Sequence, residues 1–165
     1  AVADGNIWVA VTAKLLPYSF IFIVMSILAN YVFFGVMHIP MDCGFWALNL
    51  TSALLVIATQ ALAVFLFSLF PALSISIVSM VGSLGATLGG VTFPVPHMFA
   101  PVYYASYLFP VRHFVEIGQN LLYGNYGYAY MWGNVACLLL FLIPPLLLLP
   151  HLKRSLISRK YDDIE

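Results

Sequence analysis

Four long apolar runs dominate the chain, with short breaks between the first three and a longer segment before the fourth. They cover residues 15–37, 45–70, 73–93 and 130–149, and no charged side chain interrupts any of them. About 20 mostly apolar residues are enough for an α-helix to cross the hydrocarbon core of a bilayer. The pattern therefore predicts an all-α integral membrane protein with about four transmembrane helices. The paired prolines Pro144 and Pro145 should kink the last of them.

Composition supports a membrane protein and excludes an ordinary soluble domain. Of the 165 residues, 63% are hydrophobic and 7% are charged, whereas a soluble domain is about half apolar and about a quarter charged. Lipid would therefore be the main partner of the apolar side chains. The formal net charge is zero, and the chain has no basic patch of the kind that binds nucleic acid.

Residues 94–128, between the third and fourth runs, are too apolar for a solvated loop. Pro110 is placed to open a helix there. We expect a re-entrant helical hairpin sunk into the outer leaflet, which requires cover by protein or by a watery cavity. The interfacial residues tyrosine and tryptophan cluster in this region: Tyr103, Tyr104, Tyr107, Tyr123, Tyr126, Tyr128, Tyr130 and Trp132.

The N-terminal segment from Asp4 to Ala13 is expected to form a separate, short interfacial helix. Ile7, Trp8 and Val11 recur there at helical spacing, which is typical of an apolar face lying against lipid or protein. All the residues of this segment precede the first apolar run. The whole chain would thus form a single transmembrane domain with one interfacial helix at its start.

The distribution of lysine and arginine predicts the topology. Five of the six basic residues flank the first and last runs: Lys14, Lys153, Arg154, Arg159 and Lys160. Basic residues favour the cytoplasmic side of a membrane, so both ends, including the tail 150–165, are expected to be cytoplasmic. Arg112 is the exception on the outer side, and Glu116 lies four residues on, where it can neutralise Arg112 along a helix face.

Small residues at four-residue spacing mark the third run. Gly85 and Gly89 form a GxxxG motif, and Gly82, Ala86 and Gly90 repeat the spacing beside it. Small residues let helix backbones approach closely in lipid. Two interpretations remain open: packing within the bundle of this chain, or a dimer interface or translocation path that would also include Thr92.

Ionisable residues offer little chemistry. No Asp, Glu, Lys or Arg lies within a run, which disfavours an ion-coupled transporter that drives itself. His97, His113 and Glu116 are the candidate residues of an intramembrane enzyme with a shared metal, although no HExxH motif is present. A membrane scaffold that transports nothing is the other alternative. The chain also has no GxxxxGK[ST] phosphate loop, so this chain is expected to bind no cofactor.

Several short motifs occur in a familiar order along most of the chain. In that order they resemble the membrane subunit, or permease, of type-2 ATP-binding-cassette (ABC) exporters, a bacterial family with about six spans. This chain would match the C-terminal portion of a longer permease. The motifs are AKLLPY at 13–18, SLFP at 68–71, GATLGGVTFP at 85–94, SYLFPVRHF at 106–114, QN at 119–120 and YG at 123–124.

The resemblance implies roles for particular segments. Residues Asn6, Ile7, Trp8 and Lys14 would belong to the cytoplasmic region that touches an ABC ATPase subunit, which would bind ATP and magnesium. The third run would lie near the axis of a permease dimer and the exit path. Residues 94–128 would cap that path, with Pro110, Arg112 and Glu116 in its second helix. The location would be the bacterial inner membrane, and the function efflux of a substrate that the sequence does not identify.

Overall fold

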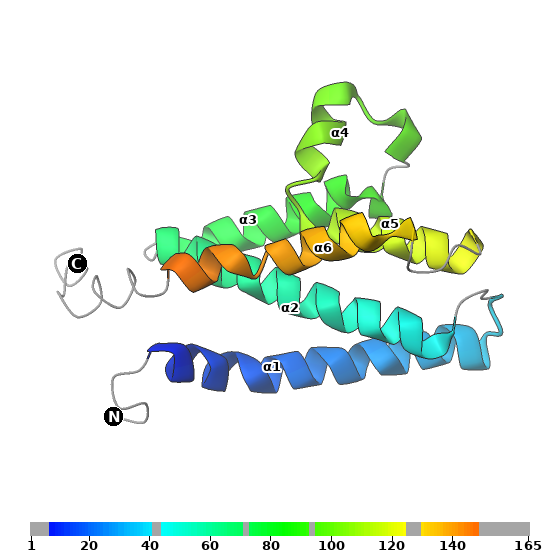
Figure 1. The fold of residues 1–165 in the computed structure, drawn as a ribbon, viewed down its shortest axis with the longest axis horizontal. Coiled ribbons are helices and arrows are strands. Elements are labelled where there is room, and N and C mark those ends of the chain that lie inside the picture. Colours follow the sequence, from blue (N-terminus) through cyan, green and yellow to red (C-terminus); the bar gives the residue numbers. More distant parts are fainter. Residues whose placement is uncertain (1–6, 41–43, 71–72, 93–94, 125–129, 149–165) are drawn as a thin grey trace, which may run out of the picture.

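The computed structural model describes residues 7–40, 44–70, 73–92, 95–124 and 130–148, and within these ranges every regular element is a helix (Figure 1). The prediction of an all-α membrane protein is confirmed. The elements are α1 (Ile7–Asn30), η1 (Tyr31–Val36), α2 (Phe45–Leu69), α3 (Ser74–Ala86), η2 (Thr87–Val91), η3 (Val95–His97), α4 (Ala100–Ser106), α5 (Pro110–Tyr123) and α6 (Trp132–Leu140).

Three helices are long and apolar enough to cross a membrane: Ile7–Val36, Phe45–Leu69 and Ser74–Val91. The fourth expected span corresponds to a shorter apolar helix, Trp132–Leu148. A helix rises about 1.5 Å per residue, so this fourth helix reaches about 25 Å and falls just short of a hydrocarbon core about 30 Å thick. Residue 149, where the fourth run was expected to end, lies outside the described residues.

The first span begins earlier than expected, and the prediction of a separate N-terminal helix is wrong. α1 runs without interruption from Ile7 through Pro17 and continues into η1. A break after Ala13 would leave several peptide groups unpaired at the edge of the membrane, whereas Pro17 costs the helix a single hydrogen bond. The Ser19 hydroxyl donates to the Leu15 carbonyl within the same stretch. The continuous helix therefore leaves fewer backbone groups unpaired than two separate helices would.

Helices α1 and α2 lie antiparallel and are tied by two side-chain hydrogen bonds. Ser19 donates to Gln60 at 2.6 Å, and Asn30 donates to Asn49 at 2.9 Å. The two bonds are separated by the same number of residues on both helices, so they fix one register. No residue of α1 is buried, because within this chain α1 packs along α2 and leaves most of its circumference open (Figure 1).

The core lies where α5 packs between α2 and α6. Ala58 of α2, Ile117 and Leu121 of α5, and Met131 and Leu138 at α6 form its buried cluster. α5 runs toward the end of the bundle that lies opposite the start of α1 (Figure 1). The helix predicted to open at Pro110 is confirmed, and it belongs to the central packing of the bundle.

The last helix is interrupted where its prolines demand it. α6 ends at Leu140, a turn occupies Phe141 and Leu142, and a second helical stretch follows over 143–148. Pro144 and Pro145 lack the N–H groups that would bond the carbonyls of residues 140 and 141. The predicted distortion is confirmed, and it takes the form of a short break between two helical pieces.

Candidate functional site at the contact of α3 and α5

The glycine face of α3 and η2 packs tightly against the beginning of α5. A Cβ atom on Gly85 would lie 3.0 Å from Cδ1 of Phe109, and one on Gly89 would lie 2.8 Å from Cγ1 of Val111. The same Cβ on Gly89 would lie 3.3 Å from the backbone nitrogen of Arg112. Carbon atoms in ordinary contact are about 3.5–4.0 Å apart. Only glycine allows the two backbones to approach this closely, as the GxxxG motif predicted.

This contact places the start of α5 beside the C-terminal half of the third span. Gly85 and Gly89 lie roughly 17–23 Å along the helix from Ser74. The backbone at the start of α5 is covered there by α3 and η2. This is the protein cover that a re-entrant hairpin needs, and the position of the hairpin in the bilayer stays a prediction.

The end of the third span departs from α-helical geometry. Residues Thr87–Val91 form a π-helix, and Gly90 adopts a left-handed conformation with φ of 94°. A side chain on Gly90 would be strained by this φ and would lie 3.0 Å from Val95. π-helical turns occur frequently at functional sites. The geometry makes Gly90 the point at which the third span ends and the chain turns toward α4.

The same face of α3 is open one turn before Gly85. No atom lies within 4 Å of a Cβ built on Gly82, which is three residues from Gly85 and seven from Gly89 and therefore shares their face of the helix. A cavity of ≈ 160 Å³ opens here, lined by residues that include Gly82, Gly85 and Pro110. Gly85 and Gly89 thus pack against α5, Gly82 lines the cavity beside this contact, and Ala86 and Thr92 are exposed.

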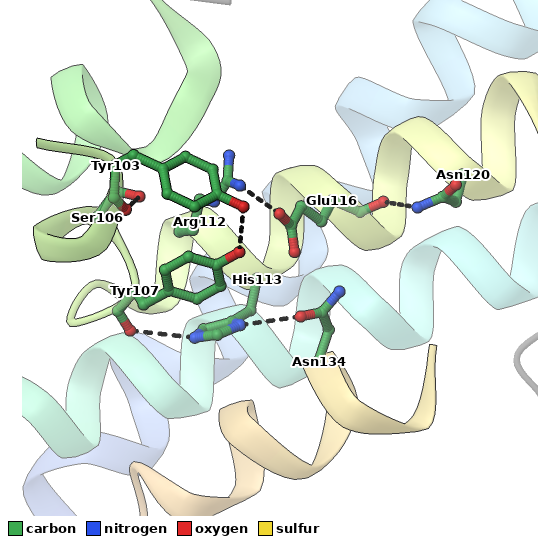
Figure 2. A network of polar contacts seen from close by, with 8 residues as sticks. All are labelled: Tyr103, Ser106, Tyr107, Arg112, His113, Glu116, Asn120 and Asn134. Carbon is green, nitrogen blue, oxygen red and sulfur yellow. Dashed lines mark hydrogen bonds and ion pairs between the residues drawn. The ribbon is translucent and has the colours of Figure 1, made fainter. Parts of the chain in front are cut away.

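Arg112 is the centre of a buried polar network beside this contact (Figure 2). Its side chain is 1% exposed and pairs with Glu116, one helical turn further along α5. The guanidinium carbon lies 5.3 Å and 5.2 Å from the ring centroids of Tyr103 and Tyr107. Nε and Nη1 of Arg112 have no hydrogen-bond partner among the described residues. The two aromatic faces partly replace those missing acceptors through cation–π attraction.

The two tyrosines are tied to each other as well as to Arg112. Their hydroxyl oxygens lie 2.8 Å apart, and this hydrogen bond is the main cause of the raised pKa of Tyr103, to which the charge of Tyr107 also contributes. A phenol ordinarily titrates near pH 10, so Tyr103 stays protonated at neutral pH. The tyrosine pair is a neutral aromatic clamp that holds α4 against the charged residue of α5.

His113 joins three segments. Its Nε2 lies 3.1 Å from the carbonyl oxygen of Tyr107, and its Nδ1 lies 3.1 Å from Oδ1 of Asn134 on α6. The partner of Nε2 is the backbone of Tyr107, and the partner of Nδ1 is the side-chain amide of Asn134. Figure 2 shows the imidazole between the α4–α5 turn and α6. The ring therefore links the turn before α5 to α6, and both of its nitrogens take part in this link.

Comparison with known proteins places this arrangement in a family. A family model described as ABC-2 family transporter protein matches residues 1–149. The chain belongs to the ABC-2 transporter family. No curated protein and no solved structure match it. ABC-2 chains are the membrane-spanning permease components of ABC transporters, and they carry no ATPase motif of their own.

Within this ABC-2 chain, the residues predicted for an intramembrane enzyme do not form a ligand set. In the part of the chain that the structure describes, no three His, Cys, Asp or Glu side chains are grouped so that they can hold a metal. His97 is exposed, whereas His113 bonds Asn134 and Glu116 pairs with Arg112. The metal-dependent alternative therefore has no geometric support among these residues.

Sequence reasoning placed the Arg112–Glu116 pair correctly and missed its surroundings. The spacing of four residues predicted the pair, and the structure confirms it. Tyr103 and Tyr107 were assigned to the membrane interface as a group, and nothing in their spacing indicated that they enclose Arg112. Asn134 carried no signal at all, because its partner His113 is distant in sequence.

The residues expected to contact an ATPase lie at the start of α1. Asn6 lies outside the described residues. Ile7 and Trp8 are half-buried in the first turn of α1, and Lys14 is exposed about two turns further on. All three described residues of this ABC-2 chain thus lie on one continuous helix, which extends from the end of the bundle into the membrane.

Proposed function

We propose that the chain forms part of the translocation path of an ATP-driven exporter. It would act with a second permease and with two ABC ATPase subunits, which bind ATP and magnesium. The observation that carries the proposal is the close contact of Gly85 and Gly89 with the re-entrant α5, found in a chain of the ABC-2 family. This contact joins the third span and the hairpin into one body that can move as a unit.

The exposed small residues of the third span support the placement of the path. Gly82, Ala86 and Thr92 are exposed within this chain, so they offer a surface to a second chain. In this proposal the second permease faces that surface, and substrate passes between the two. Gly90, with its φ of 94°, turns the chain out of the third span toward α4 and so helps to hold the hairpin against this span.

α1 supports a route by which ATP binding moves the membrane domain. Its continuity from Ile7 to Asn30 means that a displacement at Trp8 is carried rigidly into the bilayer. The Ser19–Gln60 and Asn30–Asn49 bonds then pass the movement to α2. ATP binding would favour the outward-open arrangement through contacts made only in that state.

The orientation of the bundle agrees with a cytoplasmic location for both ends. The start of α1 and the C-terminal end of Trp132–Leu148 lie at the same end of the bundle (Figure 1). In a bacterial inner membrane this end would face the cytoplasm, where the ATPase subunits are. The hairpin α4–α5 would then belong to the outer half.

The first experiment is gentle detergent extraction of the tagged full-length protein, followed by quantitative mass spectrometry of what co-purifies. We expect an ABC ATPase in stoichiometric amount. Trp8→Ala should lower its recovery severalfold because Trp8 lies at the proposed contact. The matched control is Tyr123→Ala, which removes an exposed aromatic side chain at the opposite end of the bundle and should leave recovery unchanged.

Two results would contradict the proposal. One is an intact, folded protein that co-purifies with no ATPase. The other is equal loss of the ATPase in Trp8→Ala and Tyr123→Ala, because this would show that α1 does not carry the contact.

A further inference from the structure

A groove opens at the N-terminal end of the bundle, between the beginning of α1, the end of α2 and the beginning of α3. Its volume is ≈ 460 Å³, and its walls are largely apolar, with Ala63, Phe67, Ile75 and Val78 among them. Lys14 and Ser79 also line it. The groove is separate from the α3–α5 contact, which lies further along α3.

Lys14 gives this groove a positive charge at the level of the membrane surface. It immediately precedes the uncharged run 15–37, and a run of that length fills the hydrocarbon core, so the ammonium lies at its boundary. Among the described residues the only other lysine or arginine is Arg112, which is buried against Glu116. No salt bridge of Lys14 is found in the described part of the chain.

The lining of the groove favours a lipid as the occupant. Its walls are mostly apolar side chains, and Lys14 adds one positive charge to them. An anionic phospholipid has the matching parts, because it joins an apolar acyl chain to a negatively charged head group.

We propose that the groove binds an anionic phospholipid of the leaflet at this end of the bundle. The phosphate group pairs with the Lys14 ammonium, and an acyl chain lies against Phe67, Ile75 and Val78. Lipid tails gain little by leaving other tails, so the charge decides which lipid is retained. The proposal depends on the membrane location of the chain and not on its ATPase partner.

The test is native mass spectrometry of the full-length protein, stripped of lipid in detergent and then titrated with two phospholipids. The probes are phosphatidylglycerol, which is anionic, and phosphatidylcholine, which is zwitterionic, with identical acyl chains. We expect wild-type protein to prefer phosphatidylglycerol about fivefold, which corresponds to about 1 kcal/mol for one basic residue near anionic lipid. Lys14→Ala should remove the preference, and Lys14→Arg should retain it.

A second pair of variants tests the groove itself. Ser79→Trp places a large ring in the groove and should weaken binding of both lipids, whereas Ser76→Trp alters an exposed serine of α3 that does not line it. Equal affinity for the two lipids, or a preference that survives Lys14→Ala, would overturn the proposal. So would a dimer that binds no lipid and that Ser79→Trp dissociates, because the occupant would then be a second copy of the chain.

Discussion

Replacement of Gly89 by alanine measures how closely the third span and α5 approach. The added methyl group would meet Val111 at 2.8 Å and the backbone of Arg112 at 3.3 Å. Overpacking of this kind costs about 1–3 kcal/mol. Alanine also gains up to about 1 kcal/mol over glycine from helix propensity. With that gain taken in full, we expect a net destabilisation of about 0–2 kcal/mol relative to wild type, and of about 1–3 kcal/mol relative to an alanine substitution that adds no close contact.

Gly82→Ala is the matched control on the same helix. No atom lies within 4 Å of its new methyl group. Only the gain in helix propensity remains, so Gly82→Ala should stabilise the protein by up to about 1 kcal/mol. The assay is reversible unfolding of the full-length protein in mixed detergent micelles. Val111→Ala, which removes the methyl group that Gly89→Ala would strike first, should recover part of the lost stability when the two substitutions are combined.

The comparison of the stabilities of Gly89→Ala and Gly82→Ala tests whether α3 and α5 approach each other closely. If Gly89→Ala were as stable as Gly82→Ala, the close approach of α3 and α5 would not exist in the folded protein. The basis for treating them as one moving body would then be lost.

Two further experiments test the polar contacts. Glu116→Ala should destabilise the protein by about 3–5 kcal/mol, because it leaves the buried Arg112 charge without its partner. Adding Arg112→Met to Glu116→Ala should restore stability, and an unchanged unfolding midpoint for Glu116→Ala alone would contradict the pairing. A double-mutant cycle on Asn30 and Asn49, each changed to leucine, should give a coupling energy of about 0.6 kcal/mol, typical of hydrogen bonds between membrane helices; a coupling of zero would show that this bond does not form.

Helices whose role is to face lipid were predictable from the sequence, because hydropathy alone determines them. The second run was expected over 45–70 and is observed as Phe45–Leu69, and the third differs from its expected limits by no more than two residues. The start of α1 was not predictable in the same way. Lys14 and the start of the uncharged run at residue 15 suggested a boundary, but the cost of leaving backbone groups unpaired at a helix end outweighs this signal.

The partners of the candidate residues depend on tertiary structure. The motif of Gly85 and Gly89 predicted a close approach but did not say which helix approaches. The spacing of four residues was enough to predict the contact of Arg112 with Glu116, since they share one helix face. No spacing predicted the contact of Tyr103 with Arg112, because a side chain on α4 reaches α5 only after the chain has turned back. Contacts within one helix were therefore predictable, and contacts between helices were not.

The charged residues of α5 also constrain how the protein enters the bilayer. α5 has 14 residues and carries both Arg112 and Glu116, and an arginine at the bilayer centre costs about 2.5–3.5 kcal/mol on insertion scales. A segment this short and this charged does not insert on its own hydrophobicity. We therefore expect the long apolar helices to insert first and α5 to enter the site that they form, so that the hairpin is among the last parts to reach its place.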